Sequence, residues 1–493
     1  MTSRTFMTVL ALAGGTIGIV LAVVLLNTIR FRSKQIDPPP QAGISVDKEA
    51  PDRLSEALRY RTITKRDPSA LDRPAFEALF DYFGTAFPRV HEAMQVTPVN
   101  GLSRLYTWRG STPSLDPVVL MAHVDVVPVA ENAEAAWTHP PFAGTKANGY
   151  VWGRGALDDK ASAVGLLEAA ETLLREGVQP RRTVHIALGH DEEVGGANGA
   201  QALAEQITAD GVNPAFVLDE GGAITDGALP DVAHPVAVIG IAEKGYLTVE
   251  IEADGPGGHS SVPPDTTSIE VVAEAVRRLR DNPLPASLEG VTGQTFEYVA
   301  PEMSLPVRTA FANQWLTRPL LTWALGRNDV TDAAIRTTTA PTMLDAGVKD
   351  NVVPSTARAV VNFRIVPRQS VANVMDHVRS TLHDLPVSFA LGQNSEPTPV
   401  SDVTGPWFPL IHHTLRQVVS DPLIVAPYLV PGTTDSRYYA PHSDHVYRFA
   451  PFRLTPDDRE RIHGTDERIS LEEYTTMVQF YAQLIRNADA VDS

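Results

Sequence analysis

The chain has 493 residues, 43% of them hydrophobic and 20% charged, which suits a globular protein of about two to four domains. Lys and Arg number 41 against 59 Asp and Glu, and the resulting net charge of −18 disfavours binding to nucleic acids. The absence of cysteine excludes disulfides, thiolate metal ligands and a cysteine nucleophile. Any metal site must therefore use His, Asp and Glu.

The N-terminal segment differs from the rest of the chain. Residues 5–29 contain no charged side chain and could cross about 30 Å of hydrocarbon as a helix, so we predict a transmembrane anchor. A cleaved signal peptide is the alternative, although its apolar region spans only about 7 to 15 residues. Residues 30–50 contain three successive prolines, at 38–40, and are typical of a stiff, extended spacer. Three basic residues directly after the span favour a cytoplasmic body by the charge rule.

Beyond the spacer, short apolar runs alternate with helical patterns, which predicts an α/β fold. The runs 118–122, 184–188 and 216–218 are typical of parallel strands that are buried on both faces. Apolar residues at helical spacing from Ala163 to Leu174 predict the helix that connects the first two strands.

The pattern changes at Tyr246, where apolar and polar residues begin to alternate as in a strand with one solvent-exposed face. A helix, a second alternating strand and another helix follow within 244–393, which predicts an inserted α+β domain. The main domain is then divided into 51–243 and 394–493, and helical patterns predominate in its second part. Within the insert, 282–339 shows no clear pattern in spite of its aromatic residues.

Charged side chains gather where the predicted strands end. The first strand leads into His123 and Asp125, and a spacing of two places both side chains on one face. Asp125 could there orient the imidazole of a metal-binding His123, although a buried histidine bonded to a neighbour gives the same pattern. Asp158 and Asp159 stand at the start of the connecting helix, where a single aspartate would already serve as the N-cap.

Carboxylates also follow the second and third strands. The second leads into Asp191, Glu192 and Glu193, which repel one another unless solvent, a proton or a cation compensates their charge. The third ends in Asp219 and Glu220. Ligands of open α/β sheets bind at this carboxyl edge, so the sequence predicts a site there.

Together with His463 near the C-terminus, these residues form a set of two histidines and at least four carboxylates. Such a set suits two Zn²⁺ ions that share a bridging carboxylate and activate a water molecule. One carboxylate must stay off the metal to accept the proton of that water, which gives a use to the adjacent pair Glu192 and Glu193.

Six motifs occur in this order: His123-x-Asp125, Gly155-x-x-Asp158-x-Lys160, Asp191-Glu192-Glu193-x-Gly195-Gly196, Asp219-Glu220-Gly221, Gly257-Gly258-His259-Ser260 and Ile462-His463-Gly464-Thr465-Asp466-Glu467. Through them, residues 50–481 resemble the aminoacylase and carboxypeptidase S family of co-catalytic zinc hydrolases. Within that family, the string around Glu192, the large insert and the N-terminal span are most similar to carboxypeptidase S and the N-fatty-acyl-amino-acid synthase/hydrolase.

The resemblance implies a mixed-sheet zinc-exopeptidase domain with an inserted lid or dimerisation domain and two Zn²⁺ ions per subunit. It implies these metal ligands: His123, Asp158 as the bridge, Glu193, His463, and either Asp219, which we favour, or Glu220. Asp125 would orient His123, and Glu192 would be the general base and acid. In this family the peptide bond between Asp158 and Asp159 is expected to be cis.

The resemblance also implies residues that bind the substrate. His259 would reach the active site of a partner subunit and polarise the scissile carbonyl, which implies a homodimer. Asn351 and Arg437 match positions that hold the substrate's carboxylate, and a guanidinium binds a carboxylate bidentately. The simpler interpretations are that His259 and Asn351 are turn residues and that Arg437 forms a surface ion pair.

The implied activity is hydrolysis of the amide bond of small peptides or N-acyl amino acids with a free carboxylate, by a metallopeptidase of carboxypeptidase or aminoacylase type. A narrow small-molecule deacylase is one alternative. A membrane-tethered binding protein on an inactive hydrolase fold is another, but such a protein would typically lack a ligand or the base. Relatives with a similar N-terminal span are secreted or vacuolar, which favours a body outside the cytoplasm, against the charge rule.

Overall fold

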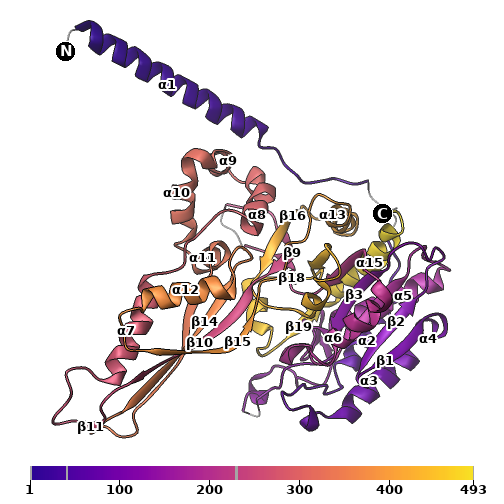
Figure 1. Ribbon diagram of the computed structural model, residues 1–493. Coiled ribbons are helices and arrows are strands. Elements are labelled where there is room, and N and C mark those ends of the chain that lie inside the picture. Colours follow the sequence, from indigo (N-terminus) through magenta and orange to yellow (C-terminus); the bar gives the residue numbers. More distant parts are fainter. Residues whose placement is uncertain (1–2, 40–42, 131, 228–230, 492–493) are drawn as a thin grey trace. The chain divides into compact units, whose positions relative to one another are not determined.

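The computed structural model describes residues 3–39, 43–130, 132–227 and 231–491 (Figure 1). The chain divides into two compact units. The first consists of Met1–Gln35, Asp231–Ala233 and Lys244–Pro397, and the second of Ile36–Pro230, His234–Glu243 and Thr398–Ser493. In sequence, Lys244–Pro397 therefore interrupts the second unit.

The second unit is built on a mixed sheet that has ten strands among the described residues, with β1-β2-β6-β3-β7-β17-β9-β8-β18 as its path and β16 paired to β9. Its strands are β1 (Gln95–Val99), β2 (Ser103–Trp108), β3 (Val118–His123), β6 (Val184–Gly189), β7 (Phe216–Asp219), β8 (Ile224–Thr225), β9 (Val236–Glu243), β16 (Ile424–Val430), β17 (Val446–Arg448) and β18 (Arg453–Leu454). The central strands β6, β3 and β7 are parallel, which confirms the three strands predicted from their apolar runs.

The helices of the second unit are α2 (Ala50–Ala57), α3 (Arg73–Ala86), α4 (Pro88–Ala93), α5 (Lys160–Arg175), α6 (Ala200–Ile207), α13 (Trp407–Val418), α14 (Pro456–Arg461) and α15 (Leu471–Ala488). Helix α5 is the predicted connection between β3 and β6, and it is buried along almost its whole length. It packs on α15, where Gly165 leaves room for the side chains of Met477 and Tyr481.

A small sheet completes this unit and consists of β4 (Thr145–Ala147), β5 (Tyr150–Trp152) and β19 (Arg468–Ser470). The expectation of mainly helical structure after Gln393 was wrong in part, because β16, β17, β18 and β19 lie there alongside the helices. β16 is a short, uniformly apolar run, which periodicity cannot distinguish from a buried helix.

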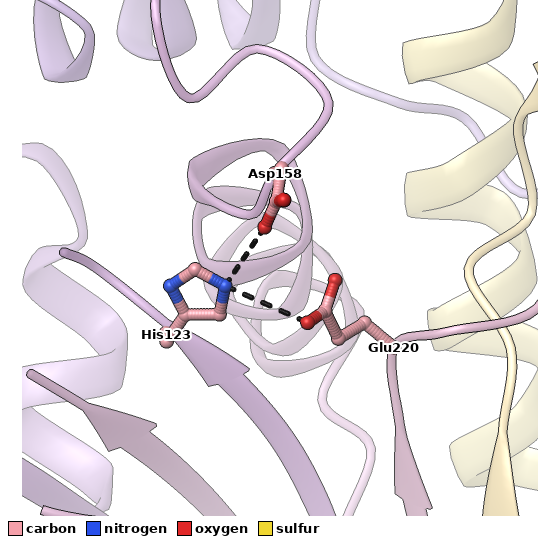
Figure 2. A group of neighbouring side chains, drawn as sticks. All are labelled: His123, Asp158 and Glu220. Atoms are coloured by element: carbon pink, nitrogen blue, oxygen red, sulfur yellow. Dashed lines mark hydrogen bonds and ion pairs between the residues drawn. The ribbon is translucent and has the colours of Figure 1, made fainter. Parts of the chain in front are cut away.

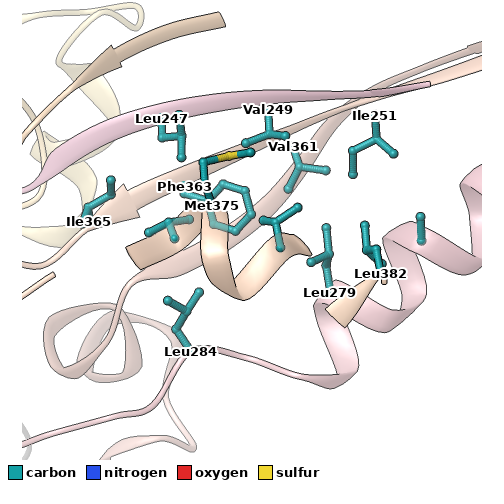
Figure 3. Close-up of a cluster of buried hydrophobic side chains, with 13 residues drawn as sticks. Leu247, Val249, Ile251, Leu279, Leu284, Val361, Phe363, Ile365, Met375 and Leu382 are labelled. Carbon is teal, nitrogen blue, oxygen red and sulfur yellow. The ribbon is translucent and has the colours of Figure 1, made fainter. Parts of the chain in front are cut away.

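The first unit contains an antiparallel sheet of order β12-β14-β10-β15. Apart from the segment between α7 and β12, the elements of Lys244–Pro397 are β10 (Gly245–Asp254), β11 (Gly258–His259), α7 (Ser268–Asp281), β12 (Thr338–Ala346), β13 (Val352–Val353), β14 (Thr356–Ile365), α12 (Val371–Thr381) and β15 (Ser388–Ser395). Figure 3 shows the core: Leu247 and Phe363 from the sheet pack with Leu279 of α7 and Met375 of α12. Each large side chain buried in this way stabilises the fold by about 1.5–3 kcal/mol. The alternating strands and both helices are confirmed.

The segment 282–339, which had no clear pattern, is mostly helical. It forms α8 (Val291–Val299), α9 (Leu305–Ala312), α10 (Gln314–Leu325) and α11 (Asp329–Ile335). Phe296 and Phe311 stack in its small core with ring centroids 4.4 Å apart, and Leu321 and Ile335 pack beside them.

The N-terminal segment forms α1 (Ser3–Arg30), which contacts α9. Its portion Leu12–Arg30 has a mean hydropathy of 2.2 and is long and apolar enough to cross a membrane, a test that a signal sequence also passes. Residues 31–39 have no regular secondary structure. The last proline of the predicted spacer, Pro40, lies outside the described residues.

Candidate metal centre

Five predicted site residues lie at the ends of elements in the second unit. His123 is the last residue of β3, and Glu220 follows β7 directly. Glu193 lies in a 3-10 helix, η3 (Glu192–Val194), after β6, and Asp158 lies just before α5. His463 follows α14 with a φ of +60°. Because β3, β6 and β7 run in parallel, their carboxyl ends meet at one edge of the sheet.

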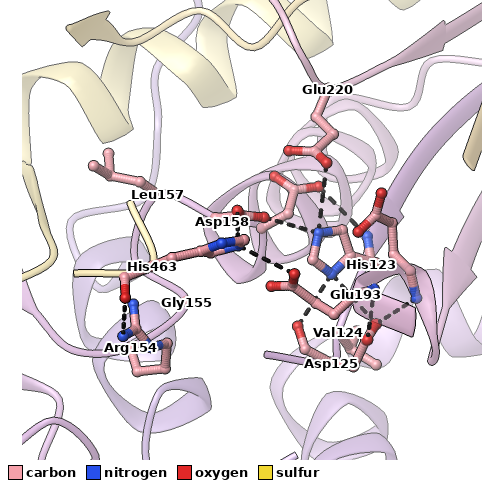
Figure 4. A network of polar contacts seen from close by, with 12 residues as sticks. His123, Val124, Asp125, Arg154, Gly155, Leu157, Asp158, Glu193, Glu220 and His463 are labelled. Carbon is pink, nitrogen blue, oxygen red and sulfur yellow. Dashed lines mark hydrogen bonds and ion pairs between the residues drawn. The ribbon is translucent and has the colours of Figure 1, made fainter. Parts of the chain in front are cut away.

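These five side chains form two groups that share Asp158, and within each group the potential ligand atoms lie within 4.8 Å of one another. In the first group, Nε2 of His123 lies 2.9 Å from Oδ1 of Asp158 and 3.6 Å from Oε1 of Glu220 (Figure 2). In the second, Nε2 of His463 lies 3.0 Å from Oδ2 of Asp158 and 3.1 Å from Oε2 of Glu193 (Figure 4). Each oxygen of Asp158 therefore faces a different group.

This donor set fits a pair of zinc ions. Imidazole nitrogens and carboxylate oxygens are normal zinc ligands. Oε1 of Glu193 is buried and has no hydrogen-bond partner among the described residues, so it is available to a cation. Burial raises the pKa of Glu220 to about 7, and the nearby carboxylate of Asp158 adds to the effect. The repulsion between these carboxylates would be relieved by a cation between them.

The two neighbouring carboxylates at the end of β7 are not equivalent. Glu220 belongs to the first group, whereas Asp219 belongs to neither. Oδ2 of Asp219 instead accepts a hydrogen bond from the backbone N–H of Ser436 at 2.7 Å. Successive side chains of an extended chain point to opposite sides, so only one of the two can face His123. This geometry supports Glu220 as the candidate ligand in place of Asp219, which we favoured from the sequence.

Asp125 connects His123 to the loop after β6. Its Oδ1 lies 3.3 Å from Nδ1 of His123, and its two carboxylate oxygens accept the backbone N–H groups of Glu192 and Glu193, each at 3.2 Å. Asp125 is completely buried. A carboxylate in this position holds the orientation of the imidazole and the position of the loop together.

Glu192 belongs to neither group of potential ligands. Burial raises the pKa of its carboxyl well above the ordinary value, and the carboxylates of Asp435, Glu220 and Asp158 add to the rise. A carboxyl group whose pKa is raised in this way can both accept and donate a proton near neutral pH.

Glu467 was quoted in the last sequence motif without a role, and the structure gives it one. It is completely buried and pairs with the equally buried Arg154, with 2.7 Å between Oε2 and Nη1. It also accepts three backbone N–H groups, those of Gly155, Leu157 and Asp158, at 3.0, 2.7 and 3.1 Å. Glu467 therefore fixes the turn that carries the shared carboxylate.

Arg154 extends this network to the second histidine. Its Nη2 donates to the backbone oxygens of His463 and Gly464, at 3.1 and 2.8 Å (Figure 4). The pair of Arg154 and Glu467 thus joins the two loops that present Asp158 and His463. A charged pair separated by some 300 residues leaves no local signal in the sequence, apart from an arginine between two glycines.

The cis peptide bond predicted between Asp158 and Asp159 is confirmed.

Arg437 lies in the same unit, in the 3-10 helix η6 (Asp435–Tyr439). Its Nη2 donates to the backbone oxygen of Gly195 at 2.5 Å, and its guanidinium lies 4.9 Å from the centre of the Tyr438 ring. It is therefore held against the loop that contains Glu193.

His259 and Asn351 lie in the first unit, where the structure brings them together. His259 is in β11, which pairs with β13, and the N–H of Ser260 donates to the backbone oxygen of Asn351 at 3.2 Å. The imidazole is exposed, and its Nδ1 accepts the backbone N–H of Ser261 at 3.1 Å. The proton of a neutral His259 must then reside on Nε2.

Comparison with known proteins places the chain in a family. Residues 119–487 match Peptidase family M20/M25/M40. The chain is 38% identical to the probable carboxypeptidase S-like 2 of Dictyostelium discoideum over 485 residues. This matched region covers 96% of this chain and 92% of that one. It is 40% identical to the N-fatty-acyl-amino acid synthase/hydrolase PM20D1 of Xenopus tropicalis over 446 residues. This region covers 90% of this chain and 86% of the relative.

Among solved structures, the M20 family metallo-carboxypeptidase Sso-CP2 from Sulfolobus solfataricus has the same fold. Its TM-score is 0.65 at 17% identity, over 90% of this chain and all of that one. The family match, the two relatives and the grouping of histidines and carboxylates agree with one another. The chain therefore belongs to Peptidase family M20/M25/M40 and is a hydrolase of the M20 metallopeptidase type.

Proposed function

We propose that this protein is a two-zinc hydrolase that cleaves the amide bond of small peptides or N-acyl amino acids with a free carboxylate. The observation that carries the proposal is Asp158, whose two oxygens face two separate groups of potential ligands. His123 and Glu220 would hold one ion with Asp158, and Glu193 and His463 would hold the other. The names of the relatives, a carboxypeptidase and an N-fatty-acyl-amino acid hydrolase, support this substrate class.

When bound, the two ions would supply Lewis acidity that polarises the carbonyl and lowers the pKa of the attacking water. Glu192 accepts the proton of that water and delivers it to the leaving nitrogen. Asp125 positions Glu192 through the backbone N–H group that it accepts, and it holds the ring of His123 at the same time. Arg154 and Glu467 hold the turn that contains Asp158 and the loop that contains His463 in fixed positions relative to each other.

Arg437 binds the carboxylate of the substrate, because its guanidinium offers two parallel donors and its contact with Gly195 restricts its position. His259 of a second subunit polarises the scissile carbonyl, which makes the active form a homodimer. The proton on its Nε2 suits this role, because that nitrogen can then donate to a carbonyl oxygen. Asn351, which lies beside His259, would contact the carboxylate end of the same substrate.

We propose the following roles for the segments of the chain. Residues 51–243 and 394–493 form the catalytic domain, and 244–393 form the lid or dimerisation domain. Residues 5–29 anchor the protein in a membrane, 30–50 serve as the spacer, and the catalytic domain lies outside the cytoplasm. The complete set of ligands and base argues against a binding protein on an inactive fold.

The test is a substrate panel for the full chain, loaded with zinc in detergent. The panel contains dipeptides and N-acyl amino acids from acetyl to oleoyl, each paired with its C-terminal carboxamide, and mass spectrometry measures the released amine. We expect hydrolysis of the free acids and at least tenfold slower hydrolysis of the carboxamides, which cannot form the ion pair with Arg437. Equal rates for both forms would remove the carboxylate from recognition, and no turnover of any amide would favour a binding protein.

A further inference from the structure

One face of α10 is apolar and solvent-exposed in the described part of the chain. Trp315, Leu316, Leu320 and Trp323 are 58%, 53%, 60% and 59% exposed. At 100° per residue these positions fall on one side of the helix, whereas Leu321 on the opposite side packs into the helical core. An exposed patch of this kind marks an interaction surface.

The same part of the first unit holds the end of α1 (Figure 1). Asn313, between α9 and α10, is 1% exposed and accepts a hydrogen bond from Nδ2 of Asn27 at 3.0 Å. Its own Nδ2 donates to the backbone oxygen of Val24 at 3.2 Å. Arg308 of α9 donates to the backbone oxygen of Phe31 at 2.6 Å. The last two turns of α1 are therefore seated on the α9–α10 pair.

This contact fixes the depth of α10 if α1 spans a membrane. The uncharged stretch 5–29 of α1 measures about 37 Å as a helix, somewhat more than the roughly 30 Å of hydrocarbon that it would cross. Wherever the helix is placed along the bilayer normal, Val24 and Asn27 then lie within about 8 Å of the end of the span. Asn313 contacts both residues and directly precedes α10, so the start of α10 lies close to the interfacial layer of the bilayer.

The composition of the exposed face suits that layer. Tryptophan is enriched where membrane meets water, because its ring is apolar and its N–H is polar. The guanidinium of Arg327 lies 4.8 Å from the centre of the Trp323 ring, where it can meet lipid phosphate.

We propose that the exposed face of α10 docks into the surface of the same lipid bilayer that α1 crosses. The first unit then contacts the membrane at a second place, in addition to its attachment through the N-terminal helix. The inference rests on the membrane anchor proposed above, but not on the hydrolytic activity.

Intrinsic fluorescence provides a selective test, because the chain has six tryptophans. Trp108, Trp137, Trp152 and Trp407 are at most 8% exposed, so a lipid quencher can reach only Trp315 and Trp323. The full chain is reconstituted into phosphatidylcholine–phosphatidylglycerol vesicles whose acyl chains are brominated close to the headgroup. We expect loss of up to about one third of the emission, since two of the six tryptophans are exposed. Trp315→Phe/Trp323→Phe should abolish this quenching.

Two leucine variants serve as probe and control. Leu316→Gln/Leu320→Gln should reduce the quenching at least twofold, because it makes the docking face polar. Leu344→Gln, on β12, changes a leucine that is also 66% exposed and should leave the quenching unchanged. Turnover of a soluble N-acetyl amino acid by both variants should equal that of the wild type, which separates docking from catalysis.

Extraction with alkaline carbonate reports on the anchor separately. Unquenched emission from protein that resists extraction would overturn the docking while leaving the anchor intact. Release of the protein by carbonate would overturn both. Dimerisation in detergent that Leu316→Gln/Leu320→Gln abolishes would assign this face to a second copy of the chain and refute the membrane contact.

Discussion

The carboxylate of Glu467 accepts a hydrogen bond from the backbone N–H of Asp158, with 3.1 Å between the two atoms. Asp158, which belongs to both groups of potential ligands, is thus held in place by a glutamate that belongs to neither. Glu467→Gln would keep an acceptor for the N–H groups but would leave Arg154 buried without its counter-charge. We expect zinc affinity to fall by about 10- to 100-fold, as measured by competition with a chelator. Glu460→Gln, an exposed change on α14, should have no effect, and an unchanged affinity of Glu467→Gln would contradict the positioning role.

Two adjacent glutamates should give different phenotypes. Glu192→Gln keeps the shape of the side chain and removes the base, so hydrolysis should fall by about 10²- to 10⁴-fold while two zinc ions remain bound. Glu193→Gln should instead weaken the second zinc site, because a neutral amide replaces a charged ligand. Parallel measurements of turnover and of bound metal distinguish the two. Undiminished turnover by Glu192→Gln would remove Glu192 from the mechanism.

The neighbouring carboxylates after β7 allow a matched comparison. Glu220→Gln should lose at least tenfold in affinity at the first zinc site, because Glu220 faces His123. Asp219→Asn should retain both ions, since Asp219 bonds the backbone of Ser436 and the new amide keeps an oxygen acceptor. Metal content after dialysis against a weak chelator gives the answer. Loss of zinc from Asp219→Asn alone would reverse the assignment.

Arg437 is expected to act on substrate binding. Arg437→Lys keeps the charge but loses the second donor, so KM for a free-acid substrate should rise at least tenfold with a smaller change in kcat. The matching carboxamide substrate should show little difference between variant and wild type. A loss of kcat with both substrates would show that Arg437 serves the reaction centre and not the carboxylate.

His412 should make the second unit sensitive to acid. Burial lowers the pKa of His412 to about 4, and its Nε2 has no hydrogen-bond partner among the described residues. In the unfolded chain the pKa returns to about 6.5. Between these pH values only the unfolded chain binds this proton, so the free energy of unfolding falls as the pH falls from 6.5 to 4, by about 3 kcal/mol.

Urea unfolding of the metal-free protein at pH 7 and pH 5 measures this effect. His412→Leu should remove part of the difference between the two midpoints, because burial also lowers the pKa of His185 to about 4. His413→Leu is the matched control on the same helix, since His413 is only partly buried and contacts Gln417 at 2.8 Å. Equal acid sensitivity in His412→Leu and the wild type would show that other groups cause it.

The sequence predicted the grouping of His123 and Glu193 because the carboxyl ends of parallel strands meet at one edge of a sheet, whereas Asp158 and His463 were added through the family motifs. The choice between Asp219 and Glu220 was beyond it. The two residues are adjacent at a strand end, and the side that faces His123 depends on where β7 stops. The sequence could not predict the role of Glu467 either, because that role arises only when two distant loops meet.

The same reasoning explains the failure over 282–339. Amphipathic periodicity identifies a helix by contrast between a buried apolar face and an exposed polar one. In α10 the exposed face carries Trp315 and Leu320, which are as apolar as the buried Leu321, so the contrast is weak. A helix that carries apolar residues on both faces is what we expect if its exposed face docks into a membrane, as proposed above.

Titration of the metal-free wild-type protein with zinc, with the rate of N-acyl amino acid hydrolysis followed at each addition, tests the central claim most directly. Two groups of ligands joined by Asp158 predict that binding saturates at two equivalents and that the rate reaches its maximum only with the second. Saturation at one equivalent with full activity, or full activity without added metal, would contradict the two-zinc account.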